Sequence, residues 1–171
     1  MQIRRSSLHD LSRIMEIIDD AKVLLKSLHI DQWQNGYPNA EQVKNDIKNE
    51  ESYVIIDDKN TIVATTMFTT RPEPTYKKLI DGNWMHDEAL PYGVIHRLAV
   101  AKEYRALGVA KFVFTQMHQT LKLQNIKSLK VDTHEENLGM QTLIKKIGYQ
   151  YRGIIYTSYG AKRLAFEKVI S

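Results

Sequence analysis

Tyr104-Arg105-Ala106-Leu107-Gly108-Val109-Ala110 is the stretch that decides the fold, because it separates two segments with different hydrophobic periods. Before it, residues 93–100 form a short apolar run rich in β-branched side chains, which predicts a buried strand. After it, the apolar residues recur with a helical period through residue 123; they are Val109, Phe112, Val113, Met117 and Leu121. We therefore expect the chain to pass from a strand through a tight loop into a helix.

The loop itself has the features of an anion-binding site. The first turn of a helix has backbone N–H groups without intrahelical partners, and the helix dipole adds partial positive charge there. Gly108 permits a positive φ or the close approach of a ligand, Ala110 is small, and Arg105 and Lys102 add charge beside the turn. We predict that residues 105–110 hold a diphosphate through several N–H groups. On these residues alone, an ordinary strand-to-helix turn is the alternative.

Two motifs give the chain a family resemblance. Arg105-x-x-Gly108-x-Ala110 after an apolar strand resembles the acetyl-CoA signature of the GCN5-related N-acetyltransferases (GNAT), which is Arg/Gln-x-x-Gly-x-Gly/Ala. Downstream, Asn137-x(8)-Lys146-x-Gly148-Tyr149 is similar to the last motif of that family, an asparagine that opens a helix ending in Lys-x-Gly-Phe/Tyr. The resemblance covers nearly the whole chain. It implies an α/β acyl-CoA N-acyltransferase (GNAT) fold, with a mixed, mostly antiparallel sheet, splayed central strands and helices on both faces.

Local patterns along the rest of the chain predict the same order of elements. Strands are expected over residues 2–5, 52–56, 61–68, 93–100, 128–133, 149–157 and 162–169. Ser7 with Asp10 predicts the start of a helix that ends near residue 29, with an apolar stripe of Leu11, Ile14, Met15, Ile18, Ala21, Leu25 and Leu28. Asn39 is expected to cap a second helix through residue 47. The last helix starts at Asn137, ends at Gly148 as a C-cap, and packs Leu138, Met140, Leu143, Ile144 and Ile147 inward. The resulting order, β-α-α-β-β-β-α-β-α-β-β, is that of the resembled family.

The composition limits the class of protein. A chain of 171 residues is long enough for one domain, which we expect over residues 1–171. It has no cysteine, which excludes a disulfide framework and a thiolate metal site and fits a reducing cytoplasm, and its histidines lack a metal-ligand spacing. It has no signal-peptide pattern and no apolar run near the ~20 residues of a membrane span. Its 24 basic and 20 acidic residues are spread out, so we expect neither a nucleic-acid nor a membrane partner.

The resemblance implies how acetyl-CoA would be held. In the family a bulge separates the cofactor strand from the next strand, and the pantetheine arm binds to main-chain groups, which by motif position belong to Leu98, Ala99 and Val100. The Leu98 N–H would face the thioester oxygen. Asn137 would bind the pantetheine through its amide, or serve only as a helix N-cap. The other cofactor contacts implied are Arg105, Ala106, Leu107, Gly108, Val109, Ala110 and Lys146.

The acid and the base are less well defined by the motifs. His96 lies two residues before Leu98, so strand alternation places both on one face, where His96 would act as the base or simply pack under the sheet. Many relatives carry a proton-donating tyrosine seven residues after the asparagine, but here that position is Ile144. His134 would then act as the acid, or lie in the loop as a solvated side chain. Tyr149 and Tyr104 are further candidates.

Two segments are candidates for contact with the acceptor. The segment of residues 30–38, between the first two helices, forms a wall of the acceptor pocket in the family, so Trp33 and Tyr37 would face the substrate; alternatively, they cover the core. Residues 71–91 form a long insertion, in which Tyr76, Leu79, Ile80 and Trp84 would make a short helix over the acceptor cleft. The alternative for the insertion is a solvent-exposed excursion.

The resemblance implies an N-acetyltransferase that moves the acetyl group of acetyl-CoA to a primary amine by direct attack in a ternary complex. The acceptor would be a small-molecule or peptide amine. Dimerisation is common in the family, and in a homodimer the final hairpin would be the contact. The alternative, suggested by Ile144, is a non-catalytic acetyl-CoA-binding module of the same fold. A nucleic-acid-binding domain is disfavoured because basic and aromatic residues are not interleaved on any strand.

Overall fold

The structure is a computed structural model that describes residues 1–87 and 89–170. Within these residues the chain forms seven β-strands and four α-helices, in the order predicted. The strands are β1 (Gln2–Arg5), β2 (Ser52–Ile56), β3 (Ile62–Thr69), β4 (Gly93–Val100), β5 (Ser128–Thr133), β6 (Gln150–Tyr156) and β7 (Lys162–Val169). The α-helices are α1 (Leu11–Ser27), α2 (Ala40–Lys48), α3 (Val109–Leu123) and α4 (Leu138–Lys146).

The strands belong to one mixed sheet with the order β1-β2-β3-β4-β5-β7-β6. The pairs β1–β2, β2–β3, β5–β7 and β6–β7 are antiparallel, whereas β4 and β5 are parallel, with Gly93 opposite Leu129 and Val94 opposite Lys130. A parallel pair needs a crossover connection, and α3 supplies it. The predicted α/β class with a mixed sheet is therefore confirmed.

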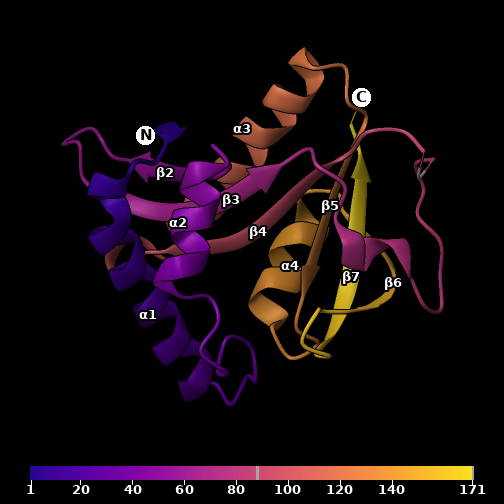
Figure 1. Cartoon of the computed structure of the whole chain (residues 1–171), viewed down its shortest axis with the longest axis horizontal. Helices are drawn as coiled ribbons and strands as arrows, with labels where there is room; N and C mark the ends of the chain where they lie inside the picture. Colours follow the sequence, from indigo (N-terminus) through magenta and orange to yellow (C-terminus); the bar gives the residue numbers. More distant parts are fainter. Residues whose placement is uncertain (88, 171) are drawn as a thin grey trace. The chain divides into compact units, whose positions relative to one another are not determined.

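The chain divides into two compact units, of which the first consists of residues 1–68 and 96–116. Its helices α1 and α2 lie side by side (Figure 1). One hydrophobic cluster joins the buried faces of α1 and α2 to β2 and the end of β4; its members are Ile14, Ile17, Ile18, Val43, Val54, Ala99 and Ala101. The helix stripe predicted for α1 is confirmed at Ile14, Ile18 and Leu25.

The prediction was wrong at Leu28, whose side chain is 57% exposed. The helix ends at Ser27, Leu28 is its C-cap residue, and His29 has a φ of +58°. Because the helical period stops there, a residue in the next position of the stripe no longer has to face the core. Asn39 caps α2 as predicted, since its side chain accepts a hydrogen bond from the Gln42 N–H.

The second unit consists of residues 69–95 and 117–171, of which 69–87, 89–95 and 117–170 are described. Its strand β7 runs between β5 and β6 (Figure 1). Gly148 ends α4 with a φ of +94°, as predicted. Ile144 on α4 is fully buried, but Leu138 is 67% exposed, contrary to prediction. Leu138 is the first residue of the helix and follows the exposed residues Glu135 and Glu136, so it lies at the solvent end of the stripe.

The insertion over residues 71–91 matches neither interpretation in full. Among its described residues, 71–87 and 89–91, the helical part is one short 3-10 helix, η2 (Pro74–Lys77), so the prediction that Leu79, Ile80 and Trp84 belong to a helix was wrong. Tyr76 and Trp84 are buried in one hydrophobic cluster with Tyr92, Val94, Ile155 and Ala165. The insertion is therefore not a solvent-exposed excursion, because its large aromatic side chains form part of the core of the second unit.

Candidate active site

The loop that precedes α3 has the backbone geometry of an anion-binding turn. Gly108 has a φ of +81°, as its residue type suggested, and Ala106 is also left-handed, with a φ of +62°. Ala106, Leu107 and Gly108 are exposed. The N–H of Phe112 bonds to the Gly108 carbonyl at 3.0 Å and opens the helix. The N–H groups of the residues before Phe112 in the first turn of α3 therefore have no intrahelical acceptor.

Arg105 adds a guanidinium group to this loop. Its Nε donates to the Val100 carbonyl oxygen at 3.3 Å, which holds the side chain against the end of β4. Its Nη2 is buried and has no hydrogen-bond partner among the described residues. A buried donor without a partner is costly, and a bound anion would supply the acceptor. The left-handed turn, the start of a helix and this guanidinium together fit a diphosphate such as that of coenzyme A.

Strand β4 contains a backbone irregularity at Arg97. Arg97 has a φ of +55° in the middle of the strand, a left-handed conformation that costs a non-glycine residue about 1–2 kcal/mol. The regular alternation used to place His96 and Leu98 on one face does not hold across such a residue. Alternation therefore gives no support to a shared face for these two residues, and that face stays a prediction. The roles of Leu98, Ala99 and Val100 as main-chain contacts stay predictions.

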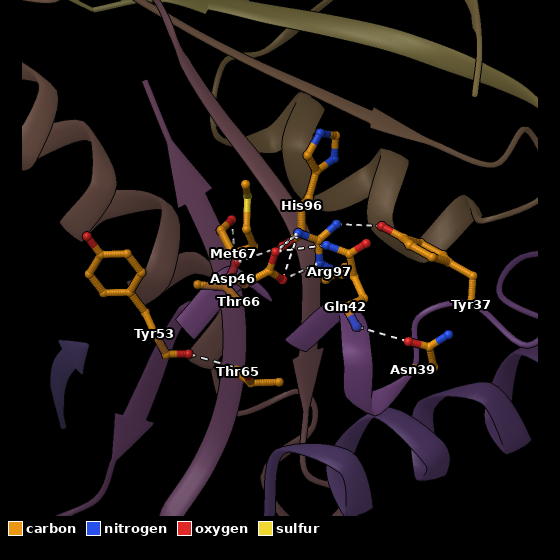
Figure 2. A network of polar contacts seen from close by, with 10 residues as sticks. All are labelled: Tyr37, Asn39, Gln42, Asp46, Tyr53, Thr65, Thr66, Met67, His96 and Arg97. Carbon is orange, nitrogen blue, oxygen red and sulfur yellow. Dashed lines mark hydrogen bonds and ion pairs between the residues drawn. The ribbon is translucent and has the colours of Figure 1, made fainter. Parts of the chain in front are cut away.

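Sequence reasoning missed the most extensive polar network at this strand. The Nε and Nη2 atoms of Arg97 donate to the two carboxylate oxygens of Asp46 on α2, at 2.9 and 2.8 Å, and Nη1 donates to the Tyr37 hydroxyl (Figure 2). The side chains of Arg97 and Asp46 are only 9% and 7% exposed. Gln42, one helical turn before Asp46, donates to it at 3.0 Å. We call Tyr37, Asp46 and Arg97 the bulge network.

Burial and ion pairing shift the pKa values of the charged groups in the bulge network. Burial raises the pKa of Asp46, while Arg97 and Gln42 act to lower it. The pKa of Arg97 is raised because Tyr37 and Asp46 outweigh the opposing effect of burial. The feature of the sequence that could have indicated this network is an arginine inside an apolar strand, because a buried charge needs a partner. The sequence did not indicate which of its acidic residues was that partner.

Trp33 and Tyr37 have different environments. Trp33 packs against the hydrophobic cluster of the first unit, which supports the interpretation that it covers the core. Tyr37 is partly buried, and its hydroxyl accepts a hydrogen bond from Arg97, so it does more than cover the core. The His96 side chain points away from the bulge network in Figure 2. Contact of His96, Trp33 and Tyr37 with a substrate stays a prediction.

In the second unit, the predicted residues His134 and Asn137 lie in the turn between β5 and α4. The Asn137 side chain accepts the Met140 N–H at 3.1 Å, which confirms its role as a helix N-cap. The Nδ1 of His134 accepts the Glu136 N–H at 3.1 Å, so the neutral imidazole carries its proton on Nε2. Gln141 donates to the carbonyl oxygens of His134 and Glu135, which fixes the turn from α4. Lys146 is exposed at the end of α4, and its cofactor contact is likewise a prediction.

The alternatives for the general acid differ in how their protons are held. Ile144, where relatives carry a tyrosine, is fully buried and apolar. The Tyr149 hydroxyl lies 2.8 Å from His118 Nε2, and burial raises the pKa of Tyr149 well above 10. The Tyr104 hydroxyl donates to Asp57 at 2.8 Å, and this bond raises the pKa of Tyr104. His134 is the remaining candidate, and its role as the acid stays a prediction.

The described residues, 1–87 and 89–170, contain no group of three or more histidine, cysteine, aspartate or glutamate side chains that could hold a metal ion. No helix among them has the length and apolar character needed to cross a membrane.

Comparison with known proteins agrees with the geometry of the loop and the order of elements. The family model described as "Acetyltransferase (GNAT) family" matches residues 15–149. A crystal structure of a GNAT-family acetyltransferase from Streptococcus agalactiae 2603 is 30% identical, with a TM-score of 0.87 over 99% of this chain and 95% of that chain. None of the curated proteins matches the chain.

More distant structures share the fold alone. A GNAT-family acetyltransferase from Listeria monocytogenes 4b F2365 is 15% identical, with a TM-score of 0.76 over 98% of this chain and 94% of that chain. A ribosomal-protein-alanine N-acetyltransferase from Brucella melitensis is 14% identical, with a TM-score of 0.68 over 99% of each chain. The family model matches most of this chain, and a 30%-identical relative aligns over nearly all of it. The chain therefore belongs to the GNAT family of acetyltransferases.

Proposed function

We propose that this protein is an acetyl-CoA-dependent N-acetyltransferase that acts on a primary amine by direct attack in a ternary complex. The observation that carries the proposal is the loop before α3, where two left-handed residues, the start of a helix and a buried guanidinium donor occur within residues 105–110. Such a loop suits the diphosphate of a nucleotide cofactor, and the family membership of the chain makes acetyl-CoA the cofactor to test.

In this proposal the N–H groups of residues 105–110 and the Arg105 guanidinium bind the diphosphate. The main chain of Leu98, Ala99 and Val100, together with the Asn137 amide, binds the pantetheine arm. The Leu98 N–H donates to the thioester oxygen, so that it stabilises the negative charge that develops there. Positioning of the amine beside the thioester then supplies a large part of the rate.

Two proton transfers complete the proposed reaction. The amine nitrogen forms a bond to the thioester carbon, and His96 accepts the proton that the amine loses, directly or through water. The bond from carbon to sulfur breaks, and the leaving thiolate takes a proton from the imidazolium form of His134, which becomes the neutral ring. The products are an N-acetyl amide and free coenzyme A. The acceptor we propose is a small-molecule or peptide amine, in a protein that works in the cytoplasm and forms a homodimer.

The cofactor site is tested by two matched glycine variants. Gly108 and Gly160 have nearly the same φ, +81° and +82°, and a Cβ added at either would have no atom within 4 Å. Gly108→Val and Gly160→Val therefore impose similar backbone strain, roughly 1–2 kcal/mol, and the Cβ of neither variant meets another atom. We expect calorimetry to show at least tenfold weaker acetyl-CoA binding for Gly108→Val and unchanged binding for Gly160→Val, which lies in the turn between β6 and β7. Equal affinities would contradict the proposed loop.

The buried apolar residue Ile144 favours a second candidate function, a non-catalytic module that binds acetyl-CoA. The two functions differ in turnover. The purified protein is mixed with acetyl-CoA and a panel of small amines and peptide N-termini, and the release of free thiol is followed. An N-acetyltransferase releases thiol with at least one amine above the rate of hydrolysis. Tight acetyl-CoA binding without amine-dependent release would support the module.

A further inference from the structure

The left-handed residue in β4 is of a type that seldom adopts this conformation. Glycine is the residue that adopts a φ near +55° without strain, yet the position is occupied by Arg97, whose side chain is almost fully buried. Backbone strain of this sort persists only where the surrounding structure holds it. The contacts around Arg97 must therefore favour the left-handed conformation over a regular strand.

The backbone on both sides of Arg97 is anchored to β3. The carbonyl oxygen of His96 accepts a hydrogen bond from the Thr66 hydroxyl at 3.2 Å, and the N–H of Ala101, just after β4, donates to the Val63 carbonyl at 2.8 Å. The residues between these anchors include Leu98, whose N–H the proposed function assigns to the thioester oxygen. The direction of that N–H consequently depends on the conformation of Arg97.

The Arg97 side chain is held by two separate elements. Asp46, on α2, takes both of its parallel donors, a geometry that a lysine cannot reproduce. The third donor reaches Tyr37, which lies in the segment between α1 and α2 (Figure 2). The guanidinium thus joins the strand, the second helix and the connecting segment at one point within the first unit.

Stability alone does not account for this arrangement. Both charged side chains are removed from water, and a buried ion pair is often no more stabilising than well-packed apolar residues. Val54, Val63 and Ala64 show that apolar side chains fill other buried positions of the same unit. A specific geometric role, namely fixing one backbone conformation, explains why a strained and buried arginine stands at this position.

We propose that Arg97 is a positioning residue for the acetyl-transfer reaction. Asp46 holds the guanidinium so that Arg97 keeps its left-handed conformation and directs the Leu98 N–H toward the thioester oxygen. Tyr37 couples the segment between α1 and α2, the predicted acceptor wall, to the same guanidinium. This inference rests on the proposed function, because it assigns a role in that reaction.

The test compares variants that separate backbone strain from the side-chain network. Arg97→Gly adopts a φ of +55° without strain but loses every contact of the bulge network; Arg97→Lys and Asp46→Asn keep the size of the side chains but lose the bidentate pair. For all three we expect kcat to fall at least tenfold, which corresponds to about 1.4 kcal/mol of transition-state stabilisation. Tyr37→Phe keeps the ion pair, so we expect KM for the amine to rise severalfold with kcat within twofold of wild type.

The control is a pair of the same kind elsewhere in the first unit. Arg4 makes a bidentate contact with Asp10, with both hydrogen bonds at 2.9 Å, and touches no residue of β4 in that network. Arg4→Lys is expected to lower the thermal midpoint while kcat and KM per folded molecule stay unchanged. A merely structural role of Arg97 predicts the same for Arg97→Lys and Arg97→Gly, and that outcome would overturn the proposal.

A spectroscopic measurement keeps the test independent of turnover. With ¹⁵N-labelled leucine, we expect the Leu98 amide resonance to shift on acetyl-CoA addition in wild type and Arg4→Lys, and to lose that shift in Arg97→Gly. An unaltered shift in folded Arg97→Gly would overturn the proposal even if no acceptor amine had been found. A wild-type protein that binds acetyl-CoA with the Leu98 shift but acetylates no amine would instead contradict the proposed function.

Discussion

At the scale of single residues, Gly108 and Arg97 are both left-handed positions of the candidate site, and they differ in how they were found. Gly108 was predicted to take a positive φ from its type and place, and it does. Arg97 was not, because arginine disfavours this conformation and no local rule predicts it there. A residue type predicts the backbone conformation only where that conformation favours the type, as a positive φ favours glycine. At Arg97 the side-chain partners hold the left-handed conformation instead.

A pair of substitutions separates the capping role of Asn137 from its proposed role in cofactor binding. Its side chain caps α4 by accepting the Met140 N–H. A serine also caps a helix, so we expect Asn137→Ser to keep the stability of the fold, whereas Asn137→Ala should lose about 1 kcal/mol. If the amide also binds pantetheine, both variants bind acetyl-CoA more weakly, as measured by calorimetry alongside urea denaturation. Wild-type affinity in Asn137→Ser would leave the residue with its capping role only.

At the scale of elements, the insertion is fastened to β6, the strand at the edge of the sheet. Ile80 exchanges two backbone hydrogen bonds of 2.8 Å with Ile154. The Nε of Arg152 donates to the Asn83 carbonyl at 2.7 Å. The insertion thus covers part of an edge that would otherwise be open to strand pairing. A homodimer formed through the final hairpin would consequently have to use its faces or the uncovered part of β6.

Close backbone approach makes Gly82 a sensitive position in this contact. A Cβ added to Gly82 would lie 1.8 Å from the Arg152 carbonyl oxygen, which is backbone and cannot rotate away. We expect Gly82→Ala to cost about 1–3 kcal/mol and to speed hydrogen exchange at the Ile80 and Ile154 amides.

Gly139 on α4 is the matched control for Gly82. An added Cβ there would meet only the Asn137 side chain, at 3.9 Å. Alanine is preferred over glycine in a helix by up to about 1 kcal/mol, so Gly139→Ala should be neutral or stabilising. Equal exchange rates at Ile80 and Ile154 in Gly82→Ala and wild type would show that the insertion is not held by this contact.

At the scale of the whole molecule, His118 makes stability depend on pH. Burial, together with the charges of Lys168 and Lys122, lowers the pKa of His118 from 6.5 to about 4. As pH falls from 6.5 toward 4, the unfolded chain binds a proton at this position that the folded chain does not. The free energy of unfolding must therefore decrease across that range.

We expect the urea midpoint of the wild type to fall between pH 7 and pH 4.5. We expect a smaller fall in His118→Gln, which does not titrate but keeps a polar group for the Tyr149 hydroxyl, 2.8 Å away in the native protein. The comparison stops at pH 4.5 because the pKa of Asp10, lowered to about 2 chiefly by its hydrogen bond from Arg4, belongs to a lower range. If the urea midpoint changed equally with pH in both proteins, His118 would be ruled out as the origin of the pH dependence.

Local rules were sufficient for the elements and for half of the site. Hydrophobic period, caps and turns depend on neighbours within a few residues, so the order of helices and strands, the cap at Asn39 and the loop around Gly108 were predictable. The same rules failed at Leu28 and Leu138, where a helix ends or begins and its period no longer controls burial.

The amino-acid sequence alone thus determined which segments form helices and strands and which loop suits a diphosphate, because those properties are local. Only the tertiary structure decided that Arg97 is paired with Asp46 and Tyr37, 51 and 60 residues away along the chain. Only the tertiary structure, likewise, buried the aromatic residues of the insertion. The physical reason is that a buried charge or ring takes its partners from whichever distant elements pack beside it, and no local pattern records that choice.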